Sequence, residues 1–301
     1  MNAPILANIE HDRQKFIGGS DIAAILGISP YKSIVDLWLD KTTPPREGGQ
    51  NAAAKRRGTR LEPYIRDMIT EEHGLQIVDF NSRYQDEEIP YFASEIDFEY
   101  FDAETGQVEN GEIKTVHPFK AKEWGDINTD LLPIHYVAQV QWGLGVKRRN
   151  RCKVFALIGD ELKPYQIDRD EETIQAMRAR AVEFWTHYVL PKVQPPLDYQ
   201  NKDVLETLKR MYPGSDGTVI EATAMHEHWR AVIETAGDMV KKYEGILDGA
   251  KAHLLAEMGS AAAIRFDDGK AFTRKVINKK GYVVEHAPSQ YVDFRLSNFK
   301  E

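Results

Sequence analysis

Two neighbouring segments carry acidic and basic residues at a spacing that suits metal-assisted hydrolysis. Asp97 precedes Glu112 and Lys114 in a pattern of the form D-x(n)-E-x-K. Side chains two residues apart on a strand point to the same face, so Glu112 and Lys114 would project together. Two carboxylates and a main-chain carbonyl such as that of Ile113 supply the hard oxygen ligands that Mg²⁺ prefers. A lysine beside them can orient a metal-activated water or stabilise charge on a phosphate.

The alternative for this pattern is a solvated strand, and three nearby features weigh against it. Glu62 stands at the expected start of a helix, although its spacing from Thr59 also fits a capping box. Gln139 and Gln141 lie on an apolar helix, where a buried amide is costly unless it is hydrogen-bonded. Basic residues form two clusters, which suit either phosphate binding or a solvated face. The first contains Lys55, Arg56, Arg57 and Arg60, and the second contains Lys147, Arg148, Arg149, Arg151 and Lys153.

The elements that position these residues alternate between helical and strand periodicity, which predicts an α/β core. Ser20 is the expected N-cap of a short helix that ends near Gly27. The other expected helices cover 33–41, 60–73, 134–146 and 171–190. The expected strands cover 75–78, 91–96, 98–101, 108–115, 152–158 and 162–167.

A proline-rich segment divides the chain. Pro191, Pro195 and Pro196 precede a polar run, so we expect a core over residues 1–199 and an extension over residues 200–301. Apolar spacing over 229–254 predicts one long amphipathic helix or a helix pair. The tail over 264–284 predicts a small β-hairpin unit.

Composition excludes several classes of protein. The chain has 301 residues, 42% of them hydrophobic, and a net charge of −8, which argues against a wholly basic surface that coats nucleic acid. Its single cysteine, Cys152, excludes an internal disulfide, a four-thiolate zinc site and a Cys-ligated iron–sulfur cluster. No phosphate-binding motor loop and no apolar stretch of about 20 residues occurs. We therefore expect a cytoplasmic protein without a membrane anchor.

The ordered motifs resemble those of the YqaJ-type viral recombinases, relatives of phage lambda exonuclease in the PD-(D/E)xK nuclease superfamily. The resemblance covers roughly residues 10–199. It is carried by Gly18-Gly19-Ser20-Asp21, Arg57-Gly58-Thr59-x-x-Glu62, Asp97, Glu112-Ile113-Lys114 and Tyr136-x-x-Gln139-x-Gln141.

The resemblance implies a restriction-endonuclease-like α/β core, with a central mixed β-sheet flanked by helices, ahead of the C-terminal helical and β-hairpin extension. It also implies roles for individual residues. The metal would be bound by Asp97, Glu112 and the Ile113 carbonyl, and Lys114 would be the catalytic lysine. Glu62 would be the additional acid and Gln139 the supporting glutamine, with Gln141 as the alternative. A 5′-phosphate would be held by Arg13 and Ser20, assisted by Ser94.

The activity implied by the resemblance is Mg²⁺-dependent digestion, with Mn²⁺ as a substitute, of one strand of linear duplex DNA from its 5′ end. Such enzymes release mononucleotides, leave 3′ single-stranded overhangs, form homotrimeric rings and work with a single-strand annealing protein in phage recombination. One departure is the missing Pro-Asp pair before the metal site, which makes Glu95 a competing ligand. An endonuclease of the same fold and a non-catalytic DNA-end-binding module are the alternatives.

Overall fold

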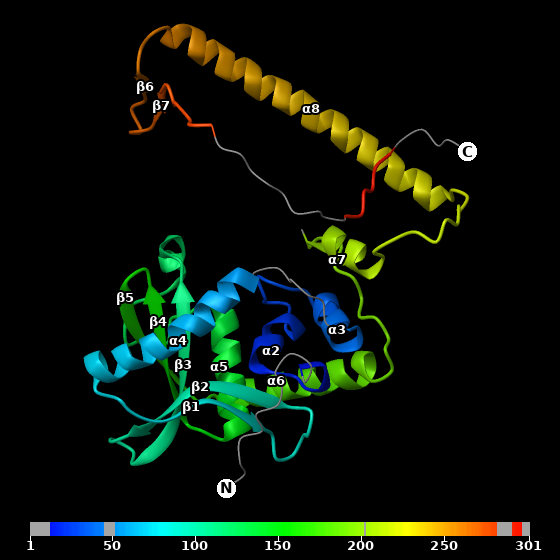
Figure 1. Ribbon diagram of the computed structural model, residues 1–301. Helices are drawn as coiled ribbons and strands as arrows, with labels where there is room; N and C mark the ends of the chain where they lie inside the picture. The colour runs from blue at the N-terminus through cyan, green and yellow to red at the C-terminus, as the bar shows by residue number, and fades with distance from the viewer. Residues whose placement is uncertain (1–12, 45–51, 202, 282–290, 297–301) are drawn as a thin grey trace. The chain divides into compact units, whose positions relative to one another are not determined.

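A five-stranded mixed sheet organises the first of two compact units, Met1–Met211 and Tyr212–Glu301. The computed structural model describes residues 13–44, 52–201, 203–281 and 291–296 (Figure 1). The strands are β1 (Gln76–Gln85), β2 (Ala93–Asp102), β3 (Gln107–Val116), β4 (Arg151–Ile158) and β5 (Glu161–Asp168).

The strands lie side by side in chain order, and their directions explain how the sheet is connected. The β3 and β4 pair is parallel, whereas the other three pairs are antiparallel. A parallel pair needs a crossover, and helix α5 (Ile134–Lys147) provides it. The two strands expected at 91–96 and 98–101 are one continuous strand, β2, which carries Asp97 beside β3.

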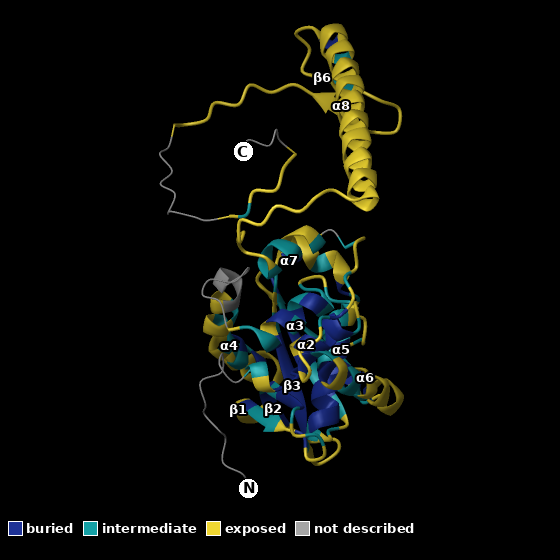
Figure 2. Cartoon of the chain, turned by 90° about the vertical axis from the view of Figure 1, so that its right-hand side faces the viewer, coloured by how far each residue is buried: buried dark blue, intermediate teal, exposed yellow. Residues whose placement is uncertain are grey.

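Helices cover both faces of this sheet with separate apolar layers (Figures 1 and 2). Helix α4 (Ala52–His73) packs Ile65 and Ile69 against Phe98 and Phe155. The other layer joins α5 to α2 (Gly19–Ile25), α3 (Ile34–Thr42) and α6 (Glu171–Phe184). The predicted α/β core, a central mixed sheet flanked by helices, is confirmed.

Three short helical turns complete the core. They are the 3₁₀ turns η1 (Arg13–Lys15) and η2 (Pro118–Glu123), and a π-helical turn, η3 (Trp185–Val189). The helix expected over 171–190 is therefore α6 followed by η3.

The starts of two helices differ from the expectation. Helix α4 begins at Ala52 rather than near residue 60, so Thr59 and Glu62 lie inside it and the capping-box alternative is wrong. Helix α2 begins at Gly19, and the Asp21 carboxylate accepts a hydrogen bond from the Gly18 N–H at 3.1 Å. Ser20 is therefore not the N-cap. Because the Asp21 carboxylate already accepts from a main-chain N–H at the start of the helix, the Ser20 side chain is left exposed to solvent.

The division between the two units follows Met211 rather than residue 199. Helix α7 (Val204–Met211) packs on α3, where the Thr207 hydroxyl donates to Asp36 at 3.0 Å and Arg210 pairs with the same carboxylate at 3.4 Å. These contacts keep α7 in the first unit.

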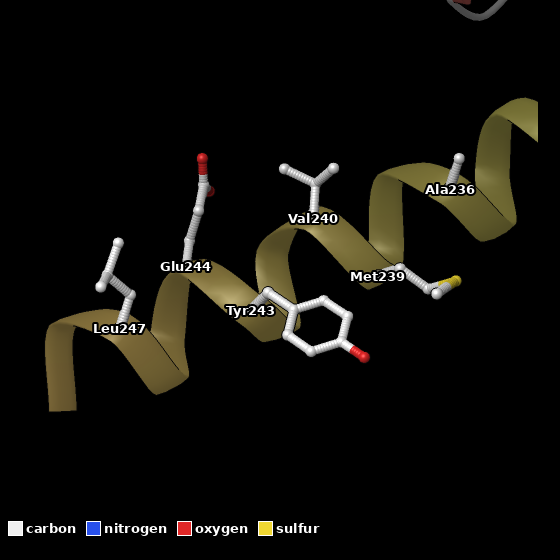
Figure 3. A pocket seen from close by; sticks show the side chains of 6 residues that line it. All are labelled: Ala236, Met239, Val240, Tyr243, Glu244 and Leu247. Carbon is white, nitrogen blue, oxygen red and sulfur yellow. The ribbon is translucent and has the colours of Figure 1, made fainter. Parts of the chain in front are cut away.

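The second unit contains one uninterrupted helix, α8 (Ala224–Met258), so the helix-pair alternative is wrong. The expected β-hairpin is confirmed as β6 (Ala263–Arg265) and β7 (Ala271–Thr273), and its expected end at 282–284 lies outside the described residues. Apolar side chains such as Val240, Tyr243 and Leu247 line α8 (Figure 3) and are exposed within the described chain. No helix in the described ranges is both long and apolar enough to span a membrane.

Candidate active site

Strands β2 and β3 bring the acidic residues of the D-x(n)-E-x-K pattern together. The Asp97 carboxylate accepts a hydrogen bond from the Ile113 N–H through Oδ2 at 2.7 Å. This bond holds Asp97 against β3 between the main-chain positions that carry Glu112 and Lys114. Glu112 is buried, with 5% of its surface exposed. The sheet therefore places the Asp97 carboxylate beside that of the buried Glu112, whose negative charge disfavours ionisation of Asp97.

Helix α5 supplies the polar side chain that joins Glu112 to Lys114. The Gln139 amide donates from Nε2 to Glu112 Oε1 at 2.6 Å and accepts from Lys114 Nζ at 3.2 Å. Lys114 also donates directly to Glu112 Oε1. Its ammonium lies 5.0 Å from the centroid of the Tyr136 ring, an arrangement that favours the charged form of the lysine. Lys114, Glu112 and Gln139 therefore form a closed hydrogen-bonded triangle.

The pKa shifts in this cluster follow from burial and from the paired acids. Burial and then the charge of Glu112 raise the pKa of Asp97 above its ordinary value. Burial and then the charge of Asp97 raise the pKa of Glu62. Burial alone would lower the pKa of Lys114, but the charges of Glu112 and Asp97 raise it above the usual lysine value. Lys114 is therefore cationic at neutral pH. A further cation bound beside it would neutralise more of the negative charge on the surrounding acids.

The donor set fits Mg²⁺ through a small number of protein ligands. In the part of the chain that the structure describes, no three His, Cys, Asp or Glu side chains group closely enough to hold a metal on their own. Mg²⁺ commonly takes only one or two carboxylates and completes its shell with water and substrate oxygens. Asp97 and Glu112, with the Ile113 carbonyl, match that requirement in ligand type. A divalent cation would also lower the raised pKa of Asp97.

Two further acids border the cluster. Glu62 projects from α4 and accepts a hydrogen bond from the Asn81 side chain at 3.4 Å. Glu95 on β2 contacts Arg13 through Oε2 at 3.4 Å, and its Oε1 is buried without a hydrogen-bond partner among the described residues. Both acids interact electrostatically with Asp97. Glu95 is thus a member of the acidic cluster, as its position two residues before Asp97 suggests.

The residues expected to hold a 5′-phosphate occupy two different environments. Arg13 Nη2 lies 3.4 Å from Ser20 Oγ, so the structure brings these two side chains together beside Glu95. Ser94 is buried instead, with 3% of its surface exposed, and its hydroxyl lies 3.2 Å from the point that a Cβ on Gly143 of α5 would occupy. Ser94 therefore faces the packed interior against α5 and not the Arg13 side chain.

The two glutamines of α5 have different surroundings. Gln139 joins the Glu112 and Lys114 cluster, whereas Gln141 donates to the Asp168 carbonyl at 2.8 Å and accepts from the Asp170 N–H at 3.0 Å. Residues two apart on a helix do not share a face, which accounts for the separation. Gln141 ties α5 to the connection between β5 and α6.

The two basic clusters also differ. In the cluster at 147–153, Arg149 pairs with Glu99 at 2.7 Å and Arg151 pairs with Asp168 at 2.9 Å, so carboxylates of the fold already neutralise these charges.

In the cluster on α4, Arg56, Arg57 and Arg60 are exposed. The helix approaches β3 there, because a Cβ on Gly58 would lie 3.7 Å from the hydroxyl of Thr115, the residue after Lys114. The exposed guanidinium groups of α4 are therefore close in sequence to the point where this helix meets β3.

A buried lysine on α3 was missed from the sequence. Lys41 Nζ donates to the Asp21 carboxylate at 2.7 Å and to the main-chain carbonyls of Arg13 and Phe16, each at 2.6 Å. A signal was available, because Lys41 follows the buried Leu37 by four residues and so lies on the apolar face of its helix.

Comparison with known proteins shows what the chain resembles. Residues 10–150 match the YqaJ-like viral recombinase domain. The chain is similar to this family over those residues. A curated relative, the uncharacterized protein YqaJ of Bacillus subtilis (strain 168), is 29% identical over 217 residues, which cover 71% of this chain and 66% of that protein. The chain thus spans just under two thirds of the length of that relative.

Solved structures that align with part of the chain include exonucleases. LHK-Exo in complex with dAMP aligns with a TM-score of 0.49 and 18% identity, covering 68% of this chain and 96% of that one. Another structure of this alkaline exonuclease from Laribacter hongkongensis gives a TM-score of 0.47 and 17% identity over the same shares. A phage-related exonuclease from Haemophilus somnus 129PT gives 0.43 and 14%, covering 59% of this chain and 95% of that one.

Proposed function

We propose that this chain is a metal-dependent deoxyribonuclease that digests one strand of linear duplex DNA from its 5′ end. The observation that carries the proposal is the convergence of Asp97, Glu112, Lys114 and Gln139 from β2, β3 and α5 into one connected cluster. The match of residues 10–150 to a viral recombinase domain supports DNA as the substrate. The exposed arginines of α4 offer phosphate contacts near the same strand.

In the proposed mechanism Asp97, Glu112 and the Ile113 carbonyl hold Mg²⁺, with Mn²⁺ as a substitute. The bound ion would polarise the scissile phosphate and lower the pKa of the attacking water. Lys114 stays protonated beside Glu112 and directs its N–H groups toward that water or toward the charge that develops on phosphate oxygens. Gln139 fixes the lysine by accepting a hydrogen bond from one of its three N–H donors. Glu62 serves as the additional acid at the edge of the cluster.

End-directed cutting is the part of the proposal supported by Arg13 and Ser20. Their side chains meet 3.4 Å apart beside Glu95, which connects them to the acidic cluster. A guanidinium and a hydroxyl are suited to bind a terminal phosphate. We propose that this contact selects 5′-phosphorylated ends, so that cleavage releases mononucleotides and leaves 3′ single-stranded overhangs.

The biological setting we propose is phage-type recombination in the cytoplasm of a bacterial host. The overhangs would pass to a single-strand annealing protein, and a homotrimeric ring would enclose the DNA. The match of residues 10–150 to a viral recombinase domain supports the setting in recombination.

The test incubates the purified chain with linear duplex DNA that carries 5′-phosphate or 5′-hydroxyl ends, beside a covalently closed circle, in Mg²⁺, Mn²⁺ or EDTA. We expect metal-dependent loss of the linear DNA only, faster with 5′-phosphate and abolished in Lys114→Ala. Lys163→Ala, which removes a strand lysine paired with Glu161, is the matched control and should cut normally. Cutting of the closed circle would indicate an endonuclease instead, and binding without cutting would indicate an end-binding module.

A further inference from the structure

The segment from Arg13 to Asp21 is folded around one buried ammonium group. Lys41 has 3% of its side chain exposed, and its three N–H donors are matched by three acceptors, the carbonyls of Arg13 and Phe16 and the carboxylate of Asp21. An ammonium is costly to bury unless it is paired and fully hydrogen-bonded. The arrangement therefore allows little freedom to any of the three acceptors.

These three contacts link the two elements that carry the anion-binding side chains. The Arg13 carbonyl belongs to turn η1, and Asp21 belongs to helix α2, where it also accepts from the Gly18 N–H. Ser20 is the residue immediately before Asp21. Lys41 thus connects the main chain of Arg13 to the turn of helix that presents Ser20.

The direct contact between Arg13 and Ser20 is too weak to fix their geometry by itself. At 3.4 Å it is longer than the usual range of about 2.7–3.2 Å for such hydrogen bonds, and both side chains are exposed. The spacing of the pair must therefore be set by the main chain that carries them. The Ile17 main chain is bonded to Tyr91 and Ala93, and Lys41 holds the two ends of the segment, at Arg13 and Asp21.

We propose that Lys41, together with Asp21, is a positioning residue on which selection of a 5′-phosphate depends. This inference rests on the proposed role of Arg13 and Ser20. The buried pair holds Arg13 and Ser20 at a spacing that accepts a terminal phosphate monoester, without contacting DNA itself. Loss of the pair leaves both anion-binding side chains in place but removes their fixed separation.

The experiment measures end preference in two ways with the full chain. Binding is followed by fluorescence anisotropy of a 3′-labelled duplex with a 5′-phosphate or a 5′-hydroxyl, in EDTA so that no cleavage occurs. Cleavage rates of the same two duplexes are then compared in Mg²⁺. The variants are Lys41→Met, which keeps the aliphatic stem, and the double variant Asp21→Asn with Lys41→Met, which leaves no unpaired carboxylate if the single variant does not fold.

Lys32→Met is the matched control, because Lys32 also pairs with Asp21, at 3.3 Å, and its other described partner is Asp40. We expect Lys41→Met and the double variant to bind the 5′-phosphorylated duplex about tenfold more weakly, because Arg13 and Ser20 without a fixed separation make a weaker charge-assisted contact to the phosphate. The affinity for the 5′-hydroxyl duplex should change little. Lys32→Met should keep the wild-type preference.

A folded Lys41 variant that melts earlier but keeps the full preference would show a merely structural role and overturn the inference. Equal losses in Lys32→Met and Lys41→Met, or a wild-type chain that binds both ends equally, would also overturn it. A wild-type chain that prefers 5′-phosphate in EDTA but cuts no DNA in Mg²⁺ would instead refute the proposed nuclease, while the binding arm still decides the role of Lys41.

Discussion

Replacement of Gln139 by alanine tests the hydrogen-bonded triangle at the centre of the proposed site. The change removes a donor 2.6 Å from the Glu112 carboxylate and an acceptor 3.2 Å from the Lys114 ammonium. Lys114 remains paired with Glu112 but loses the contact that fixes its direction. A hydrogen bond to a charged group contributes about 1.5–3 kcal/mol. If that contribution is lost only in the transition state, kcat falls by about 10- to 100-fold.

Gln141→Ala provides a matched control two residues away on the same helix. Its amide also makes two hydrogen bonds, but both go to main-chain groups of Asp168 and Asp170. Because Gln141 is buried, its loss leaves those groups unpaired at a cost of about 1–3 kcal/mol each. We therefore expect a Tm lower by several degrees and a kcat close to that of the wild-type chain.

The assay measures kcat on a 5′-phosphorylated linear duplex at saturating Mg²⁺ and Tm by thermal unfolding, for both variants. The reasoning requires opposite patterns, with a loss of rate in Gln139→Ala and a loss of stability in Gln141→Ala. An unchanged kcat in Gln139→Ala, or an equal loss of kcat in the two variants, would refute the assignment of Gln139 to the site.

Three further predictions concern stability, metal binding and packing. Although burial opposes it, the charge of Lys41 holds the pKa of the Asp21 carboxyl below its ordinary 3.8. The ionised carboxyl therefore stabilises the folded chain above that pH, and this stabilisation is lost as pH falls through the lower pKa of the folded state. Asp21→Asn should flatten the decline of Tm between about pH 5 and pH 2. Mg²⁺ should raise the Tm of the wild-type chain because it relieves carboxylate repulsion, and an equal rise in Asp97→Asn would contradict the proposed ligand. Gly111→Ala should lower the free energy of unfolding by about 1–3 kcal/mol in denaturant titrations, because a Cβ there would lie 2.0 Å from the buried Phe98 ring; an unchanged midpoint would show that the ring yields without strain.

The sequence alone was sufficient for much of the core, because most of its elements have clear periodicity. The strand that carries Glu112 and Lys114, the crossover helix of Gln139 and the hairpin of β4 and β5 were predicted close to their observed bounds. Helix starts were harder to predict. The start of α4 was missed because Thr59 and Glu62 satisfy the spacing of a capping box although the helix continues through them, and Pro63 is tolerated inside it.

Tertiary structure decided which of the candidate residues meet. Both glutamines of α5 have the same type and a similar local sequence, and only the packing of the helix on the sheet directs Gln139 to Glu112. Packing also decides the surroundings of Ser94, because the approach of α5 at Gly143 buries this side chain away from Arg13.

The sequence by itself indicated the chemistry proposed for this chain, because it shows acids, a lysine and a glutamine at strand and helix spacing. Only the tertiary structure decided how the segment around Arg13 is held. The partners of Lys41 are two main-chain carbonyls and a carboxylate that lie 20 to 28 residues away in the chain. Main-chain carbonyls leave no trace in residue type, so a contact of this kind becomes visible only when the fold brings its donor and acceptors together.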